Sequence, residues 1–510
     1  MIMKLKCTGA LVLVGAANLF FNGAAHADVR LPNLFTDHMV LQQQAKVPVW
    51  GWADEGEEVV VTFRGQKVKT KAKDGRWMVK LSALKAGGPD ALTVAGKNSL
   101  TLNDVLVGEV WICSGQSNME FPLEKSLESK TDIEASANPA IRLFKVPKLK
   151  ANAPTNDVKG AWQACNPRTV GGFSAVGYYF GRDLQKARGV PVGLIDSCWG
   201  GSPAEVWMSQ TALACNPRYE TEILGSYAEA VKRYEESQAT FELEAAAART
   251  AGKPISKNAT PRPPWKPAEL YNGMIAPLIP FAIKGAIWYQ GESNAGRAEQ
   301  YRTLFPDMIR NWRQDWNQGD FTFLAVQLAP YMAVKDEPTD SSWAELREAQ
   351  LNTTKVLPKT GMAVITDVGN PKDIHPTKKR PVGERLALAA RGVAYGEKIA
   401  YSGPVYRKME MTGDKIILQF DHAGGGLEVH EGALKGFAIC GEDHKFVWAD
   451  AMVDAKSPAK IIVSSPAVAK PVAVRYGWAD CPVVNLWNRD GLPASPFRTD
   501  DFPLTTAGKK

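Results

Sequence analysis

The sequence has few residues suited to metal chemistry, since only 7 cysteines and 6 histidines occur among its 510 residues. None of the cysteines has the spacing of a zinc site, so we expect no bound metal. Beyond the first 27 residues no apolar run is long enough to span a bilayer, which argues against membrane insertion. A stripe of basic residues interleaved with aromatics is also lacking, so nucleic acid is not an expected partner.

The first 27 residues have the pattern of a secretory signal peptide. Lys4 and Lys6 precede an apolar stretch over about 10–21, and Ala25-His26-Ala27 gives the small residues of a cleavage site. We expect cleavage between Ala27 and Asp28, and a mature protein that is periplasmic or secreted. Cleavage lowers the 61 basic residues to 59 against 54 acidic ones, and the remaining charge of +5 is scattered.

Six cysteines remain after this cleavage, and an oxidising compartment permits disulfides. Cys165 and Cys215 each begin a CNPR segment in an expected loop, which favours this pair, although sequence does not define connectivity. Cys113 and Cys198 end apolar strands, so we expect them to be buried thiols.

The chain is longer than one domain usually is, and its 45% hydrophobic and 23% charged residues are typical of a globular protein. Short strands predict an N-terminal β-sandwich domain over 28–107. In it Lys67, Lys69 and Lys71 alternate with smaller residues, which indicates a solvated sheet face. Strands and glycine-rich turns after residue 401 predict a second β domain over 402–510.

Residues 108–401 instead alternate apolar strands with helical patterns. This predicts an α/β fold, a parallel sheet with helices on both faces, whose ligand site lies off the carboxyl ends of the strands. The expected strands are 109–113, 192–196, 285–289, 322–328 and 361–367, and the expected helices are 173–188, 301–316, 343–356 and 382–394. A polar helical insertion with a proline-rich tether, at about 217–267, interrupts the pattern as a lid or as decoration.

A serine and a histidine follow two of these strands. Ser117 comes directly after the first strand, in WICSGQSNMEFP, where it is either a nucleophile or a helix cap. His375 follows the last strand, and the other histidines of the mature chain all lie in the β domains. Because both residues belong to one edge of the sheet, His375 is the candidate base that takes the proton of Ser117.

Further groups at this edge fit acyl transfer. Asp373, two residues before the histidine, is the candidate for orienting the imidazole, with a loop carboxylate as the alternative. Gly200 and Gly201, the Gln290 side chain and the Ser117 N–H are candidate donors to an oxyanion. The alternatives are a tight turn for the two glycines and a buried structural amide for Gln290.

Long segments at these positions resemble the sialate O-acetylesterase family of the SGNH (GDSL-like) hydrolase superfamily. They are GEVWICSGQSNMEFPL, PVGLIDSCWGGSPAEVW, LYNGMIAPLIPFAIKGAIWYQGESNA, DIHPTKKRPVGERLALAA and GLPASPFRTD. The resemblance implies a flavodoxin-like three-layer α/β/α core with a five-stranded parallel sheet, flanked by β domains. It also implies hydrolysis of sugar O-acetyl esters without metal or organic cofactor, with Ser117 as nucleophile and His375 as base.

One position departs from the superfamily pattern, in which the acid commonly stands three residues before the histidine. Asp373 stands two before it, so a dyad or a carboxylate from elsewhere is open. Asp367, at the end of the fifth strand, is the reserve candidate. Glu292 is a further carboxylate for which a structural role is expected.

The residues of these motifs are expected to bind the ester, and they do not identify the sugar that carries it. The expected substrate is an O-acetylated sialic acid, and acetylated xylan or another acetylated glycan is the rival within the same chemistry. A non-catalytic glycan-binding protein is the alternative of another class, and the intact Ser117, Gln290 and His375 argue against it. The sequence does not define the oligomeric state.

Overall fold

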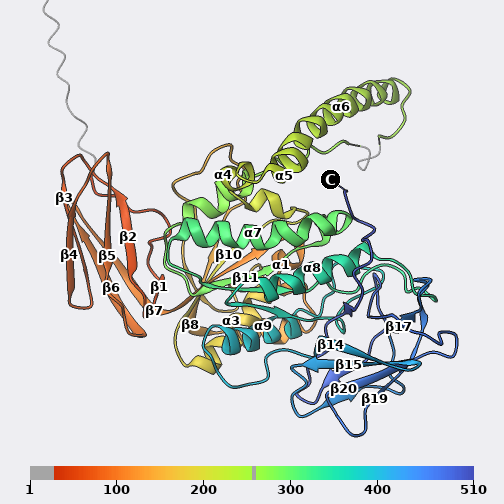
Figure 1. Cartoon of the computed structure of the whole chain (residues 1–510). Helices are drawn as coiled ribbons and strands as arrows, with labels where there is room; N and C mark the ends of the chain where they lie inside the picture. The colour runs from red at the N-terminus through yellow and green to blue at the C-terminus, as the bar shows by residue number, and fades with distance from the viewer. Residues whose placement is uncertain (1–27, 256–259, 510) are drawn as a thin grey trace, which may run out of the picture.

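The structure is a computed structural model that describes residues 28–255 and 260–509. The expected signal peptide therefore lies outside the described residues. Two β lobes flank a central α/β body (Figure 1). Within the described part of the chain, no helix combines the length and apolar character needed to cross a bilayer.

The N-terminal lobe consists of two small sheets, one of β2 and β5 and the other built around β3, β6 and β7. Alternating apolar residues in β2, β3 and β5 turn inward, whereas the lysines of β4 are exposed as expected. The strands are β1 (Val40–Gln42), β2 (Val47–Trp52), β3 (Glu58–Phe63), β4 (Gln66–Lys71), β5 (Arg76–Leu81), β6 (Gly87–Ala95) and β7 (Ser99–Gly115).

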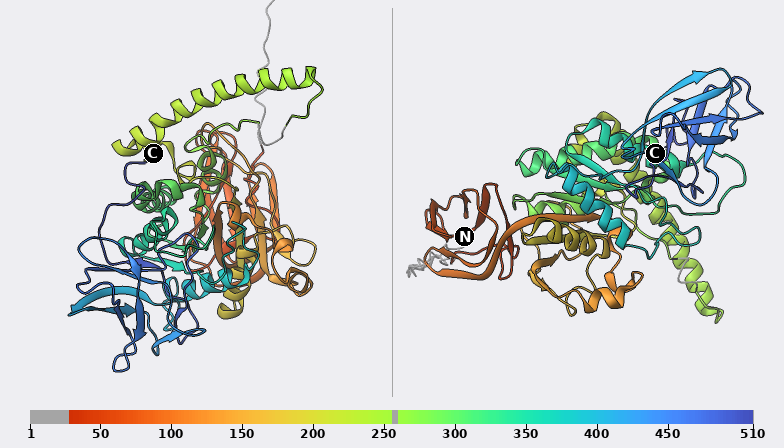
Figure 2. Two further views of the ribbon diagram at one scale, coloured as in Figure 1. Left: turned by 90° about the vertical axis from the view of Figure 1, so that its right-hand side faces the viewer. Right: turned by 90° about the horizontal axis from the view of Figure 1, so that it is seen from below.

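Strand β7 belongs to both the N-terminal lobe and the central body. Its first half pairs with β6, its middle pairs with β1, and its second half pairs with two strands of the central sheet. Figure 2 shows this long strand passing from the lobe into the body. The boundary expected at 107/108 therefore falls inside one continuous strand.

The central sheet has the order β13-β12-β11-β7-β10-β8-β9. All neighbours are parallel except the edge strand β9, so six parallel strands replace the five expected. The sequence pattern missed β8 because its centre carries Arg142, whose buried guanidinium pairs with Asp104. The further strands are β8 (Asn138–Lys145), β9 (Gln163–Cys165), β10 (Val192–Cys198), β11 (Gly285–Tyr289), β12 (Thr322–Val326) and β13 (Thr360–Ala363).

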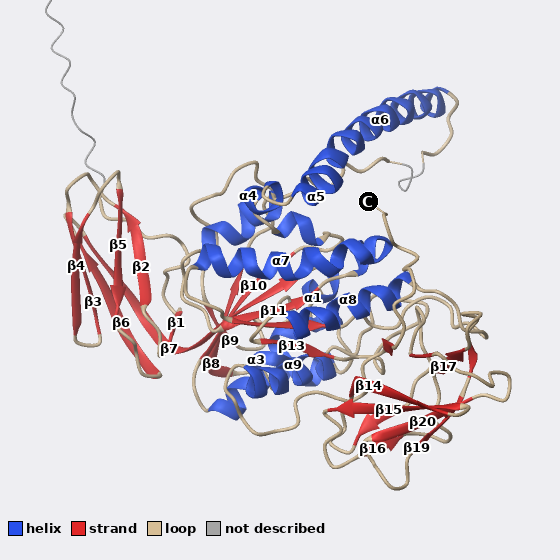
Figure 3. Ribbon diagram, in the orientation of Figure 1, coloured by secondary structure: helices blue, strands red, loops and turns tan. Residues whose placement is uncertain are grey.

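Helices cover both faces of this sheet. The α3 and α9 pair packs on one face, and the α7 and α8 pair packs on the other (Figure 3). The helices are α1 (Ser117–Glu120), α2 (Ser129–Glu134), α3 (Ala175–Arg188), α7 (Ala298–Trp316), α8 (Ser342–Val356) and α9 (Arg380–Val393). Because β7 lies between β10 and β11, the carboxyl end of β7 is the point where chain connections leave in opposite directions, the place where α/β sheets bind ligands.

The insertion forms α4 (Gln210–Ala214), α5 (Pro217–Tyr219), a π-helical turn and the long α6 (Ser226–Thr250). Figures 1 and 2 show α6 extending away from the body. Ala245 is its one buried residue, which agrees with its polar sequence. The tether that follows returns to the body, where Trp265 is partly buried.

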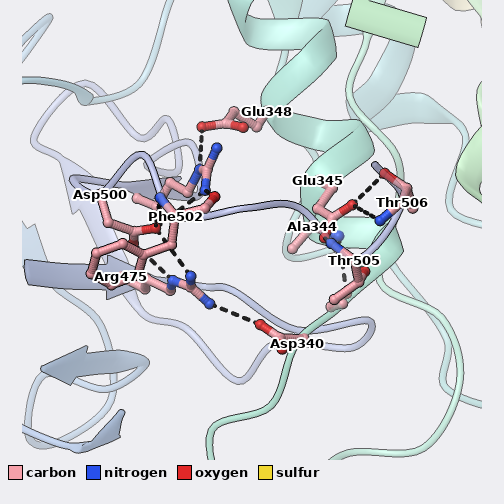
Figure 4. A network of polar contacts seen from close by, with 11 residues as sticks. Asp340, Ala344, Glu345, Glu348, Arg475, Asp500, Phe502, Thr505 and Thr506 are labelled. Carbon is pink, nitrogen blue, oxygen red and sulfur yellow. Dashed lines mark hydrogen bonds and ion pairs between the residues drawn. The ribbon is translucent and has the colours of Figure 1, made fainter. Parts of the chain in front are cut away.

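The C-terminal lobe contains a four-stranded sheet of β14, β15, β20 and β19 and a second sheet of β18, β17, β21 and β23. Acidic residues of α8 bind both this lobe and the chain end that follows it (Figure 4). Glu348 pairs with Arg498 of the lobe, and Glu345 accepts hydrogen bonds from Thr505 and Thr506 of the chain end. The strands are β14 (Val405–Thr412), β15 (Lys415–Asp421), β16 (Leu427–Val429), β17 (Phe437–Cys440), β18 (Val447–Trp448), β19 (Asp450–Val453), β20 (Lys460–Ser464), β21 (Ala473–Tyr476), β22 (Leu486–Asn488) and β23 (Phe497–Arg498).

The six cysteines of the described chain are free thiols, so the expected Cys165–Cys215 disulfide is absent from it. Cys165 is buried in the edge strand β9, where its Sγ donates to the carbonyl of Ser136, whereas Cys215 is exposed. Cys113 and Cys198 are buried thiols, as expected.

Candidate active site

Ser117 begins α1 directly after β7 ends. The turn between them depends on Gly115, whose φ is +134° and whose place has no room for a Cβ beside the carbonyl of Tyr289 on β11. Gln116 then donates its N–H to the same carbonyl at 3.0 Å. This close passage of β7 over β11 presents Ser117 at the carboxyl edge of the sheet.

His375 lies against this serine. Its Nε2 is 2.8 Å from Ser117 Oγ, although 258 residues separate the two in the chain. Such a distance allows direct proton transfer between a hydroxyl and an imidazole. The side chain of His375 is 40% exposed, which leaves the pair open to a ligand from solvent.

Asp373 lies near the histidine but engages its backbone. Oδ1 of Asp373 accepts the His375 N–H at 2.8 Å and stands 3.8 Å from Nδ1, beyond hydrogen-bond distance. Asp367, the reserve candidate, is instead held by both terminal nitrogens of Arg385, at 2.6 and 2.8 Å. Of the two aspartates, only Asp373 is placed to act on the imidazole.

The candidate oxyanion donors differ in availability. The Gln290 amide donates to the Ser202 carbonyl and to Asn294 Oδ1, and its oxygen accepts from the Tyr301 hydroxyl. This leaves neither amide hydrogen for an oxyanion and speaks against the role expected for Gln290. The sequence could not reveal this internal network, because it joins Ser202 to residues 290–301.

Gly200 lies beside the serine, since a Cβ added to it would be 3.2 Å from Ser117 Cβ. Its N–H donates to Glu120 Oε2 at 2.6 Å. The following Gly201 has a φ of +75° and makes the turn that brings this loop against α1. The N–H of Gly200, a candidate oxyanion donor, therefore lies near Ser117 but binds a carboxylate in this structure.

A buried network under the serine was not expected from the sequence. The Asn118 side chain donates to the carbonyl of Ile374 at 3.0 Å and to Glu292 Oε1 at 2.6 Å, and it accepts from the ammonium of Lys379. Asn118 and Lys379 are buried. Glu292 thus contacts the serine segment through Asn118, which Lys379 reaches from the histidine segment.

Burial sets the charges of this network. It lowers the pKa of Lys379 to about 7, although the neighbouring Glu292 opposes the change. Burial also raises the pKa of Glu292, against hydrogen bonds to its carboxylate. The pKa of His375 is lowered, first by partial burial and then by the charge of Lys379, with Asp373 opposing both. At neutral pH the imidazole is therefore mainly neutral, the form that accepts a proton.

Several groups at the rim of the site also escaped the sequence analysis. Glu120 pairs with one of two lysines from the segment after β8, and these lysines lie over two tryptophans from separate loops. The motif GQSNME already contained Asn118 and Glu120, and IHPTKK contained Lys379. Their polar character beside a candidate nucleophile was the signal that could have found them.

Comparisons with known proteins identify the family of the chain. The sequence profile of the family described as carbohydrate esterase, sialic acid-specific acetylesterase, matches residues 107–247 and 251–391. The sialate O-acetylesterases of Rattus norvegicus and Homo sapiens are 32% and 30% identical, over 92% and 94% of this chain and 94% of each relative. A carbohydrate acetylesterase from Xanthomonas citri superposes with a TM-score of 0.80 at 43% identity, covering 93% of this chain and all of that one.

These matches span both candidate catalytic segments and most of the flanking β lobes. The chain belongs to the carbohydrate esterase family of sialic acid-specific acetylesterases, and it is an esterase.

Proposed function

We propose that the protein removes O-acetyl groups from sialic acid through an acetyl-serine intermediate. The observation that carries this proposal is the 2.8 Å contact between Ser117 Oγ and His375 Nε2 at the carboxyl edge of the sheet. The names of the curated relatives support the substrate, because they are sialate O-acetylesterases. The order of the parallel strands supports assignment of the central body to the flavodoxin-like SGNH type.

In the proposed mechanism, His375 Nε2 takes the proton of Ser117 while Oγ attacks the acetyl carbon. The negative oxygen forms next to the Ser117 N–H at the start of α1, with the Gly200 N–H as second donor. The imidazolium then gives its proton to the departing sugar oxygen, which leaves acetyl-Ser117. A water molecule activated by His375 releases acetate in the second half of the reaction.

The position of Asp373 fits a secondary role, in which its carboxylate assists His375 without being essential. Its carboxylate fixes the backbone of His375 and stands 3.8 Å from Nδ1, so a small rotation brings it into contact when the imidazolium forms. Catalytic contacts are often longer in a ligand-free site than in the complex. We assign Asp373 to orienting the histidine.

The rival substrate is an acetylated neutral glycan such as xylan. The structural relative from Xanthomonas citri, a carbohydrate acetylesterase, supports this reading as well. Both substrates place the same ester on Ser117, so they differ in the sugar contacts alone. With the N-terminal sequence pattern as support, we place the enzyme in the periplasm or outside the cell, where such glycans are met.

The decisive experiment measures acetate release by the mature chain from O-acetylated sialic acid and from acetylated xylan. Ser117→Ala and His375→Ala should each reduce release at least a thousandfold while the thermal unfolding curve stays within a few degrees. A serine-directed phosphonate should label the wild type and spare Ser117→Ala. Release above a few per cent in either variant contradicts the serine mechanism, and release from xylan alone contradicts the proposed substrate.

A further inference from the structure

A rim of charged and aromatic side chains lies next to Ser117. Lys148 and Lys150 come from the segment after β8, Trp199 follows β10, and Trp265 belongs to the tether that returns from the insertion. Glu120, the last residue of α1, joins them through an ion pair with Lys148. We call these five residues the basic rim.

The basic rim holds a carboxylate within reach of the nucleophile. Oε2 of Glu120 accepts the Gly200 N–H at 2.6 Å, while its Oε1 pairs with the ammonium of Lys148. Gly200 itself packs on Ser117. One N–H and one ammonium therefore bind a carboxylate next to the glycine that packs on Ser117, and charged donors of this kind also suit a carboxylate of a ligand.

Two indole rings support both ammonium groups. The Lys150 Nζ lies 4.0 Å from the centre of the Trp265 ring, and Lys148 lies 5.4 Å from that of Trp199. The two indoles meet edge to face at 5.6 Å. A cation over the face of a tryptophan ring is held there by electrostatic attraction to the ring. The side chains of Lys148 and Lys150 nevertheless remain 44% and 38% exposed.

Charge at the rim favours an anion. Glu120 faces Lys148, and Glu269 pairs with Lys150 at 2.9 Å and also accepts the Lys266 N–H. The ammonium of Lys266 extends to Asn152, an uncharged side chain. The five residues of the basic rim carry two positive charges and one negative charge, and Glu269 pairs with Lys150 from outside the rim.

We propose that Lys148 and Lys150, supported by Trp199 and Trp265, bind the carboxylate of an acidic acetylated sugar. The incoming carboxylate replaces Glu120 as the partner of Lys148. Displaced Glu120 then releases the N–H of Gly200, which becomes free to stabilise the oxyanion. This assignment rests on the proposed serine esterase function and adds the residues that select an acidic sugar over a neutral one.

The test compares two ligands that differ in one charge. O-acetylated N-acetylneuraminic acid and its methyl ester carry the same acetyl group, but only the first has a free carboxylate. Acetate release is measured for both, and p-nitrophenyl acetate reports the chemistry without any sugar. The wild type should prefer the free acid at least tenfold in kcat/KM.

Lys148→Met and Lys150→Met should each remove most of this preference, because kcat/KM falls for the free acid and changes far less for the methyl ester. Lys148→Arg should retain the preference, because it keeps the charge. Lys67→Met, an exposed lysine of the N-terminal lobe, is the matched control and should change neither rate.

Three outcomes overturn the assignment: no preference for the free acid in the wild type, an unchanged preference in both methionine variants, or equal losses on all three substrates. Failure of the proposed function looks different, because Ser117→Ala would then still hydrolyse p-nitrophenyl acetate at the wild-type rate. Glu120→Ala tests the displacement of Glu120 independently of the lysine variants. It should raise the rate on p-nitrophenyl acetate severalfold by freeing the Gly200 N–H, and a lowered rate contradicts the displacement step.

Discussion

Asn118 joins the two catalytic segments, since its side chain donates a hydrogen bond to the carbonyl of Ile374 at 3.0 Å. The residue after the proposed nucleophile thereby holds the residue before the proposed base. The same amide binds Glu292 and Lys379, so one buried side chain connects three segments of the chain. We therefore expect the Ser117–His375 distance to depend on this contact.

Asn118→Ala should reduce kcat on p-nitrophenyl acetate at least tenfold, because the histidine loop loses its anchor on α1. The variant also leaves buried polar groups without a partner, which costs about 1–3 kcal/mol each. The melting temperature should therefore fall. Phosphonate labelling gives the fraction of folded sites, so that kcat is expressed per intact serine.

Asn33→Ala is the control for this variant, since it removes an exposed asparagine that binds Asp157 far from the site. It should leave kcat unchanged. A normal kcat per labelled serine in Asn118→Ala would show that Asn118 supports the fold alone and does not position the histidine.

The charge of Lys379 should be visible in the pH dependence of activity. His375 must be neutral to act, and its pKa is lowered by partial burial and by Lys379, which carries its charge below about pH 7. Lys379→Met removes this repulsion of the imidazolium, so the pKa of His375 rises. The acidic limb of the kcat/KM profile should move to higher pH.

Lys378→Met is the matched control, because Lys378 is the exposed neighbour of the buried lysine. Its profile should coincide with that of the wild type. An acidic limb that stays in place or moves to lower pH in Lys379→Met would refute the electrostatic link.

The two candidate acids, Asp373 and Asp367, should respond differently to substitution. Asp373→Asn should lower kcat about three- to thirtyfold with little change in stability, because the side chain is 52% exposed and acts on the histidine. Asp367→Asn should leave kcat within twofold but lower the melting temperature, because it breaks the paired hydrogen bonds to Arg385. Kinetics and thermal unfolding of both variants measure this, and the reverse pattern would make Asp367 the catalytic acid.

Sequence patterns predicted the parts of this molecule that depend on local periodicity. Apolar strands such as β10 and β11 are buried on both faces and form continuous hydrophobic runs in the sequence, so their positions in a parallel sheet could be predicted. Strand β8 was missed because the ion pair of Arg142 with Asp104 buries a charge in its centre. Contacts of this kind join residues far apart in the chain, so no local sequence pattern predicts them.

The prediction of the site was limited for the same reason, because its hydrogen bonds join residues far apart in the chain. Ser117 and His375 were predicted from scarcity and position, which sequence shows directly. The roles of Gln290, Asn118 and Glu120 depend on which hydrogen-bond partner each finds, and only the folded chain determines that. Polar residues in a motif indicate where a site lies. The role of each residue within the site becomes clear only from the folded structure.

A buried carboxylate near the site should make stability depend on pH. Asp196, at the end of β10, is buried and its Oδ2 makes no hydrogen bond within the described structure. Burial raises the pKa of Asp196 from 3.8 to about 6, although the Cys198 thiol and Lys145 oppose this. The change corresponds to a cost of about 3 kcal/mol for the ionised form.

The sign follows from the protons bound in each state. Between pH 4 and 6 the unfolded chain has released this proton and the folded chain keeps it, so the wild type loses stability as the pH rises. Asn at this position does not titrate. The melting temperature of Asp196→Asn relative to the wild type should therefore increase from pH 4.5 to pH 6.5 and then level off. Asp74→Asn, in an exposed turn, serves as control, and a difference that is constant or shrinks over this range would show that Asp196 is ionised without cost.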